Sequence, residues 1–201
     1  MLVLTAFLAS QDPRERPSDA QQQADQRHAT FADPRSDFVT VLNLWKAFQE
    51  QGAALSGSQL RKWCRENFLS FMRLREWQDL HRQLGDTVEE LKLRLNTQPA
   101  DYADLHQAIL TGFLGGIGAL DEKREYDGAR GTRFVIAPGT PLASKPPKWV
   151  VAASLMETTR LYARMVAAVE PQWIESAAVH LIKHSYSDYM EIGRASCRER
   201  V

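Results

Sequence analysis

The sequence predicts an α+β fold in which a helical bundle is followed by a small β-barrel and a closing helix. A change of pattern along the chain indicates this order. Up to about residue 114, apolar side chains recur at three- and four-residue steps, the period of helices that pack on one face. From about 115 to 170, short apolar runs alternate with glycine and proline turns, which is typical of the strands of a barrel.

The composition indicates a folded protein without an overall preference for nucleic acid. Of its 201 residues, 44% are hydrophobic and 25% are charged, which excludes a disordered chain. The 25 basic and 25 acidic residues cancel, so a nucleic-acid surface would have to be a local patch. No apolar run approaches the roughly 20 residues of a membrane span, so we expect no membrane partner. Cys64 and Cys197 are too few for a disulfide framework, and we expect a buried Cys64 and a cytoplasmic location.

The first elements are predicted to be helices. Residues 1–10 are read as a core helix because they lack the positively charged start of a signal peptide. Ser18 is expected to cap a polar helix that runs to about Phe31. Ser36 is a good N-cap for the next helix, which we expect to stop near Gly52. Its apolar stripe comprises Phe38, Val41, Leu42, Trp45 and Phe48.

Two further helices are predicted before residue 98. One begins near Ser56 or Ser58, and its apolar face comprises Leu60, Trp63, Cys64 and Phe68. The other carries a longer stripe, in which Gly85 is expected to cause a kink or a break. That stripe comprises Leu74, Trp77, Leu80, Leu84, Val88, Leu91 and Leu95. Such stripes favour core packing over binding grooves and predict a bundle with short connections.

The second half contains the signals of the barrel. Asp101 is expected to cap a helix, and the glycines of 112–118 to open a curved strand. Residues 126–136 predict a hairpin whose turn, or bulge, is the Asp127-Gly128 pair. Two more strands are predicted over 149–157 and 161–169. Pro171 occupies a favoured first position for the closing helix.

Basic and aromatic side chains gather in the predicted barrel, in the combination that binds single-stranded nucleic acid. The hairpin supplies Arg124, Arg130 and Arg133, and the proline turn before the fourth strand supplies Lys145 and Lys148. On the last strand Arg160, Tyr162 and Arg164 alternate, so their side chains point to one face. An ordinary solvated barrel surface would have the same composition, and both interpretations stay open. Phe134 and Tyr126 lie beside these cations, and Phe134 fits a core position equally well.

The motifs of common enzymes are missing from this sequence. It has no Gly-x-x-x-x-Gly-Lys-Ser/Thr loop for a nucleotide phosphate and no Gly-x-Ser-x-Gly elbow. His180 and His184 are four residues apart and would share a helix face, but no third metal ligand lies near them. We therefore expect no catalytic, cofactor-binding or metal-binding residues, and read this histidine pair as a solvated helix end.

Several short motifs, in their order and spacing, resemble the helical accessory domain that follows the motor of DEAH-box RNA helicases, most closely the bacterial HrpA-like group. In the first half they are Gln-Asp-Pro-Arg-Glu-Arg-Pro at 11–17, His28-x-x-Phe31, Ser36-Asp37-Phe38 with Leu42, Asn43 and Trp45, Cys-Arg-Glu-Asn-Phe-Leu-Ser at 64–70 and Arg-Gln-Leu at 82–84. In the second half they are Leu-Thr-Gly-Phe-Leu at 110–114, Lys-Pro-Pro-Lys-Trp-Val at 145–150 and Pro171-x-Trp173-Ile174.

This resemblance implies a division of the chain into two domains. Residues 1–98 would be a ratchet-like, helicase-associated helical bundle that is truncated at its N-terminus. Residues 99–190 would be an OB-fold domain that is truncated at its C-terminus. Residues 191–201 look like a translated sequencing adapter and are excluded from the fold.

The resemblance also implies a function without the motor itself. The chain would be the accessory RNA-binding region of an ATP-dependent 3′-to-5′ RNA helicase, gripping single-stranded RNA and coupling it to the motor domains of the parent chain. ATP and Mg²⁺ would belong to those motor domains, and ribosomal and messenger RNA are both substrates compatible with the family. Arg14 and Arg16, in the 11–17 motif, become further candidates for RNA contact. The alternative is a protein-docking module with no RNA contact of its own.

Overall fold

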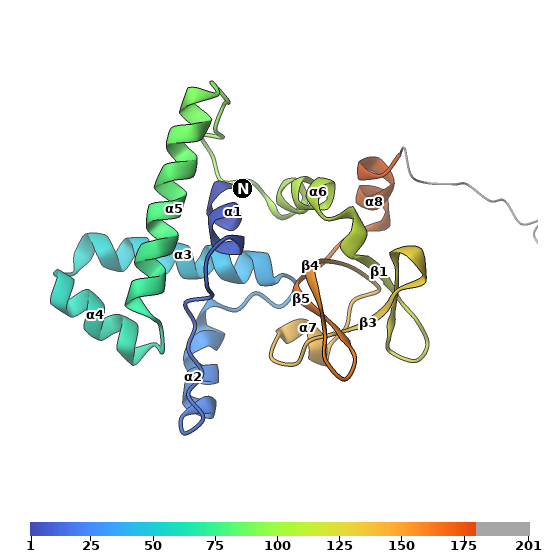
Figure 1. Ribbon diagram of the computed structural model, residues 1–201, viewed down its shortest axis with the longest axis horizontal. Helices are drawn as coiled ribbons and strands as arrows, with labels where there is room; N and C mark the ends of the chain where they lie inside the picture. The colour runs from blue at the N-terminus through green and yellow to red at the C-terminus, as the bar shows by residue number, and fades with distance from the viewer. Residues whose placement is uncertain (180–201) are drawn as a thin grey trace, which may run out of the picture.

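The computed structural model describes residues 1–179, and it contains a helical half and a barrel half (Figure 1). His180, His184, Cys197 and the predicted adapter segment 191–201 lie outside the described residues. The helical half consists of α1 (Leu2–Leu8), α2 (Gln21–His28), a 3₁₀ turn at Ala29–Phe31, α3 (Asp37–Ala54), α4 (Gly57–Glu66) and α5 (Phe71–Glu90). In this half the long helix α5 crosses α3, and α1 packs beside both.

The second half is a closed five-stranded barrel. Its strands are β1 (Ile117–Leu120), β2 (Tyr126–Gly128), β3 (Arg133–Ile136), β4 (Trp149–Glu157) and β5 (Leu161–Ala168). They close in the order β1-β2-β3-β5-β4, in which only β3 and β5 pair in parallel. Helix α6 (Tyr102–Gly112) precedes β1, α7 (Pro141–Ser144) lies between β3 and β4, and α8 (Pro171–Ala177) follows β5. The predicted α+β fold, a helical region followed by an OB-type barrel, is confirmed.

The helix starts follow from short polar side chains. Ser36 Oγ accepts a hydrogen bond from Val39 N at the start of α3, and Asp101 does the same for Asp104 N at α6. Ser56 and Gln59 form a capping box at α4. Ser18 does not cap α2, which begins only after Ala20. The polar sequence there has no apolar period to fix the start, so the cap residue alone was a poor guide.

Two glycines predicted to end or bend helices do neither. Gly52 lies inside α3, and Gly85 lies inside an uninterrupted α5. A glycine in a helix costs only about 1 kcal/mol relative to alanine, which packing of the helix readily outweighs. Instead α5 stops at Glu90, so Leu91 and Leu95 of the predicted stripe follow the helix and are exposed.

The barrel hairpin exists, but its turn is not where the sequence predicts it. Asp127 and Gly128 belong to β2, and a short 3₁₀ turn at Ala129–Gly131 makes the reversal. Arg130 and Gly131 take positive φ angles of 58° and 74° there. The ring of Phe134 packs over Gly128, where a Cβ would lie 2.9 Å from it. The glycine is therefore required for close packing of an aromatic ring and not for the turn.

Within residues 1–179, two hydrophobic cores stabilise the fold. The smaller core lies inside the barrel, where the rings of Tyr126 and Phe134 stack with centroids 5.5 Å apart. The larger core is built from the helices around Phe38 and Trp77, and it also contains Val151 and Ala167 of the barrel wall. The outer surface of the barrel is thus continuous with the helical core.

Asp37 joins the two halves by hydrogen bonds. Its carboxylate accepts from Thr140 Oγ1 at 2.6 Å and from the backbone N–H of Val166 at 2.9 Å. Met165, just before that N–H, has a positive φ of 53°. Burial raises the pKa of Asp37, and the two hydrogen bonds oppose that rise. The first turn of α3 is therefore fixed to β5 and to the segment before α7.

Candidate nucleic-acid interface

The loop between β1 and β2 (residues 121–125) presents two cations to solvent. Asp121 shapes this loop, because its Oδ1 accepts hydrogen bonds from the backbone N–H groups of Lys123 and Glu125, both at 2.8 Å. The side chains of Lys123 and Arg124 are left exposed, and Arg124 adopts a positive φ of 64°. The loop is thus an ordered turn that holds its cations outward.

An ion pair connects this loop to the loop between β4 and β5 (residues 158–160). Arg160 Nη2 donates to Glu125 Oε1 at 2.5 Å, so the two loops lie side by side. On the neighbouring strands, Arg133 of β3 pairs with Asp127 of β2 at 3.0 Å. Two of the predicted RNA-contacting arginines are therefore held by carboxylates at or next to β2.

Strand β5 places Tyr162 and Arg164 on the outer face of the barrel. Ala163 between them is fully buried in the barrel core, so its two neighbours point outward. Tyr162 pairs with Val135 of β3 on one side and with Met156 of β4 on the other. Arg164 is exposed beside Ser154, and no ion pair holds it within the described residues. This part of the face offers one aromatic ring with a cation beside it.

The three other barrel cations are exposed but lie on connecting segments. Arg130 is in the β2–β3 turn, while Lys145 ends α7 and Lys148 precedes β4. The backbone carbonyl of Lys148 accepts from Leu120 N, next to the β1–β2 loop. Lys148 therefore adds to the charge of that loop, whereas Arg130 lies at the opposite end of the short strand β2.

Arg14 and Arg16 are both engaged by carboxylates in the helical half. Arg14 forms a bidentate pair with Asp12, with Nη2–Oδ2 at 2.6 Å, and its backbone bridges to Leu69. Burial alone would raise the pKa of Asp12, but the hydrogen bonds and charge of Arg14 outweigh it and lower that pKa. Arg16 pairs with Asp25 at 2.6 Å on the surface. The half-buried Arg14 pair fixes the 11–17 segment against the chain before α5.

Two aromatic residues of the hairpin are unavailable for stacking on bases. Tyr126 is 1% exposed and Phe134 is 2% exposed, and both belong to the barrel core. Tyr126 donates its hydroxyl hydrogen to the carbonyl of Pro147 at 2.7 Å, and burial raises its pKa. His28, a residue of the helicase-like motifs, has its Nε2 bonded to the carbonyl of Phe68 at 3.1 Å. These side chains hold the fold together.

Sequence reasoning missed Lys123, and it counted Arg124 with the hairpin cations without naming it as a candidate for RNA contact. Both residues lie in a polar stretch, Asp-Glu-Lys-Arg-Glu at 121–125, that reads as a solvated surface. The available signal was its position, since the stretch connects the first two strands of an OB-type barrel. Such a loop is one of the places where this fold holds oligonucleotides.

A serine–histidine pair is the nearest approach to a catalytic arrangement among the described residues. His106 donates from Nδ1 to the carbonyl of Tyr102 at 2.6 Å, so Nε2 accepts the hydroxyl hydrogen of Ser36 at 2.7 Å. Both side chains have zero exposure, so no substrate reaches the hydroxyl. Burial lowers the pKa of His106 and keeps it neutral. The pair is a structural contact between α3 and α6.

A metal site is also lacking over residues 1–179. No group of three or more histidine, cysteine or acidic side chains is placed to hold a metal ion. Within the described part of the chain, every helix is too short or too polar to cross a bilayer. Cys64 is buried as predicted, and burial raises its pKa to about 11.

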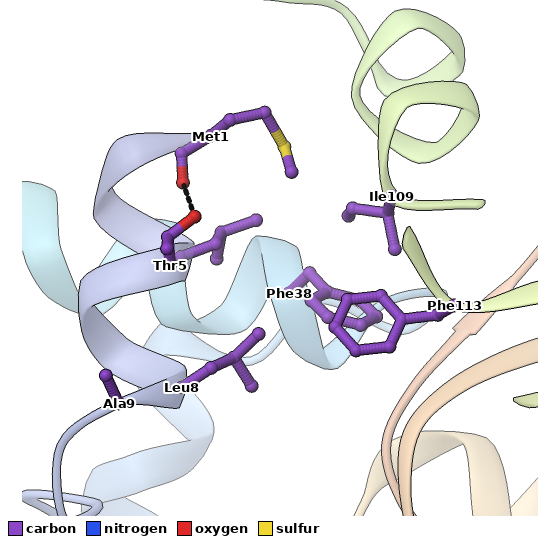
Figure 2. A pocket seen from close by; sticks show the side chains of 8 residues that line it. Met1, Thr5, Leu8, Ala9, Phe38, Ile109 and Phe113 are labelled. Atoms are coloured by element: carbon purple, nitrogen blue, oxygen red, sulfur yellow. Dashed lines mark hydrogen bonds between the residues drawn. The ribbon is translucent and has the colours of Figure 1, made fainter. Parts of the chain in front are cut away.

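An apolar hollow of about 340 Å³ lies between α1, α3 and α6 (Figure 2). The rings of Phe38 and Phe113 face the side chains of Leu8 and Ile109 across it. Its single hydroxyl, on Thr5, is bonded to the carbonyl of Met1 in the same helix. The side chains that line the hollow therefore offer little polar character with which to orient a small ligand.

Comparison with known proteins places the barrel in a defined group. A family model described as "Oligonucleotide/oligosaccharide-binding (OB)-fold" matches residues 105–181. The chain is 48% identical over 188 residues to the ATP-dependent RNA helicase HrpA of Escherichia coli, and equally to the HrpA homolog of Haemophilus influenzae. Each alignment covers 93% of this chain and 14% of the relative, so the chain spans a small part of the relatives' length.

Proposed function

Because this chain belongs to the HrpA helicase family as the counterpart of its accessory region with an OB fold, we propose that it grips single-stranded RNA and couples it to motor domains. The observation that carries the proposal is the pairing of two barrel loops. Arg160 links the β4–β5 loop to the β1–β2 loop, which carries Lys123 and Arg124. In OB folds the strand 2–3 face and these two loops hold oligonucleotides.

The chemistry of this surface suits a phosphate backbone. Between Phe113 and Val169 the chain has 8 basic and 5 acidic residues, a net charge of +3 in a chain that is neutral overall. Tyr162 supplies a half-exposed ring on which a base stacks, and Arg164 lies two residues along the same face. Cations and an aromatic ring are what binding without base recognition requires.

The ion pairs of Arg133 and Arg160 do not exclude these residues from RNA binding. The side chains of Arg133 and Arg160 are both more than half exposed, at 56% and 58%. Exposed pairs contribute about 0 to 1 kcal/mol, so a phosphate competes with the carboxylate at little cost. Asp127 and Glu125 then reduce the affinity without abolishing it. Binding of the isolated chain is expected to be weak, with a Kd on the order of 10⁻⁴ to 10⁻⁶ M.

Fluorescence anisotropy with a labelled oligouridine of about 12 nucleotides tests the proposal. We expect a loss of about 20-fold in affinity between about 50 and 200 mM salt if about three phosphates are contacted. The double variant Arg124→Glu/Arg164→Glu should weaken binding at least about tenfold, since each change removes a cation and adds a repulsive charge. Lys62→Glu on α4 is the control, because it reverses an exposed charge in the helical half.

The competing function is a docking module that binds protein and not RNA. It predicts no anisotropy change at low salt, or a change that Arg124→Glu/Arg164→Glu and Lys62→Glu reduce equally. Either result would reject the proposed RNA grip. No observation over residues 1–179 favours docking specifically, so we retain it only as the outcome of this titration.

Coupling to a motor is the second part of the proposal. The relatives are named ATP-dependent RNA helicases, whereas this chain matches a small part of them. ATP and Mg²⁺ would be held by motor domains of the longer polypeptide, in the cytoplasm. We expect the chain by itself not to hydrolyse ATP with or without RNA, which a phosphate-release assay measures. A turnover that increases with RNA would contradict this assignment.

A further inference from the structure

An open pocket of about 480 Å³ lies where α5 crosses α3, away from the barrel. Trp45 and Gln49 line it from α3, and the remaining walls come from one face of α5. The α5 side chains follow helical spacing, with Arg75, Gln78 and Arg82 in successive turns. The pocket combines flat rings, amides and cations.

The aromatic wall of the pocket is fixed from behind. The ring of Trp45 lies 4.9 Å from that of His81 and 4.7 Å from that of Trp77. Trp77 is fully buried, and its Nε1–H donates to the carbonyl of Val3 at 2.9 Å. Burial lowers the pKa of His81, so its imidazole is a neutral flat surface. Because these rings are already ordered, stacking a planar ligand on them costs little side-chain entropy.

The rim of the pocket carries two guanidinium groups two helical turns apart. Arg82 is exposed and pairs with Asp79 at 3.1 Å, a surface contact that is weak in water. Arg75 is exposed, and no ion pair to it occurs within the part of the chain that the structure describes. An anion with several oxygens, such as a phosphate, satisfies such a pair of donors.

We propose that this pocket binds a nucleotide, with the base against Trp45 and His81 and the phosphate between Arg75 and Arg82. The side-chain amides of Gln49 and Gln78 both donate and accept, so they suit the polar edge of a base. An acidic peptide would use the arginines but leave the rings without a flat partner. A metal ion is disfavoured because the only carboxylate in the lining is Asp79.

This inference is independent of the barrel surface. A free nucleotide and the phosphorylated end of an RNA strand present the same chemistry, and the experiment separates them. Adenosine 5′-monophosphate is the first probe, followed by adenosine, inorganic phosphate and an oligoribonucleotide with or without a terminal phosphate. Binding is followed on the full chain by NMR, through the indole N–H signals, which report Trp45 directly.

The expected result is a shift of the Trp45 signal by the monophosphate and a smaller one by adenosine or phosphate alone. Arg75→Gln should weaken binding about tenfold, the effect of losing one charge-assisted hydrogen bond. Asp79→Asn should strengthen binding, because it frees Arg82 and removes a repulsive charge. A merely structural role of Asp79 does not predict that gain. Lys62→Gln, on α4, is the control for nonspecific loss of charge and should change nothing.

Several results would overturn the proposal. Equal binding of monophosphate and inorganic phosphate would reduce the pocket to an anion site, and equal binding of an oligoglutamate would make it an acidic-peptide site. An unchanged Kd in Arg75→Gln, with the Trp45 signal still shifting, would place the ligand elsewhere.

The probes also identify the source of the nucleotide. If only the phosphorylated strand end binds, the nucleotide belongs to RNA. If the free monophosphate binds comparably, the pocket is a small-molecule site. Charge reversal at Arg124 and Arg164 should leave monophosphate binding intact, which distinguishes this pocket from the barrel.

Discussion

At the scale of single residues, Asp37 joins the helical half to the barrel half. One carboxylate satisfies a hydroxyl and a backbone N–H of the barrel half from the first turn of α3. Asp37→Ala should lower the free energy of unfolding by about 2 to 3 kcal/mol, because it leaves the Val166 N–H without its acceptor. Thr140→Val removes only the other bond and should cost about 1 kcal/mol. Urea unfolding measures both, and equal losses would show that the backbone contact contributes nothing.

His106 gives the fold a dependence on pH. Burial lowers its pKa in the folded state below the usual 6.5, so the unfolded state binds the proton more readily. Its contribution to stability is present above pH 6.5 and is lost as the pH falls through the folded pKa. The charges nearest to it, Asp33 and Arg35, act on this pKa in opposite directions.

We therefore expect the chain to be less stable at about pH 5.5 than at about pH 7.5. His28 and His81 also have pKa values lowered by burial and act with the same sign. His106→Gln should reduce this difference in the free energy of unfolding without removing it, which unfolding curves at the two pH values will show. A difference as large as that of the parent chain would mean that His106 does not cause the pH dependence.

Single residues were predictable where the cause is local. Ser36 and Asp101 were identified as caps because a cap acts within three residues. Tyr126 was grouped with the surface cations, yet it lies in the barrel core, because its environment is set by strands distant in sequence. The carboxylate partners of Arg133 and Arg160 are likewise fixed by pairing between strands, which composition does not reveal.

At the scale of elements, the entry into β1 depends on a glycine pressed against β4. A Cβ on Gly116 would lie 2.0 Å from the carbonyl oxygen of Ala152, a backbone atom that has no room to move. Gly116→Ala should destabilise the barrel by more than about 2 kcal/mol. Gly115→Ala is the matched control, since a Cβ there meets nothing within 4 Å. Equal melting temperatures of the two variants would contradict this account.

The elements themselves were largely predictable from period and punctuation. Apolar stripes located α3, α4 and α5, and the strands β4 and β5 fall close to the predicted ranges. Glycine was the unreliable signal, because Gly85 lies inside helix α5 and Gly128 is the last residue of strand β2. The role of a glycine depends on what packs against it, as Phe134 does on Gly128, and that neighbour is known only from the fold.

At the scale of the whole molecule, the larger core crosses the predicted domain boundary at residues 98 and 99. Val151, Ala167 and Val169 of the barrel half pack with the helices. We expect the chain to unfold in one step, because the two halves share the larger core. Far-ultraviolet circular dichroism follows mainly the helices, and fluorescence of a variant with Trp149 as its only tryptophan follows the barrel. Transitions at separate urea concentrations would show two independent units.

The joint between the two halves also has a mechanical side. Tyr102 donates to the carbonyl of Ala168 at 2.9 Å, stacks on His106 and lies beneath the guanidinium of Arg35. With Asp37 beside it, this cluster connects the barrel to the helices through several side-chain contacts. We therefore expect a force applied to the β4–β5 loop to move the barrel and the helices together.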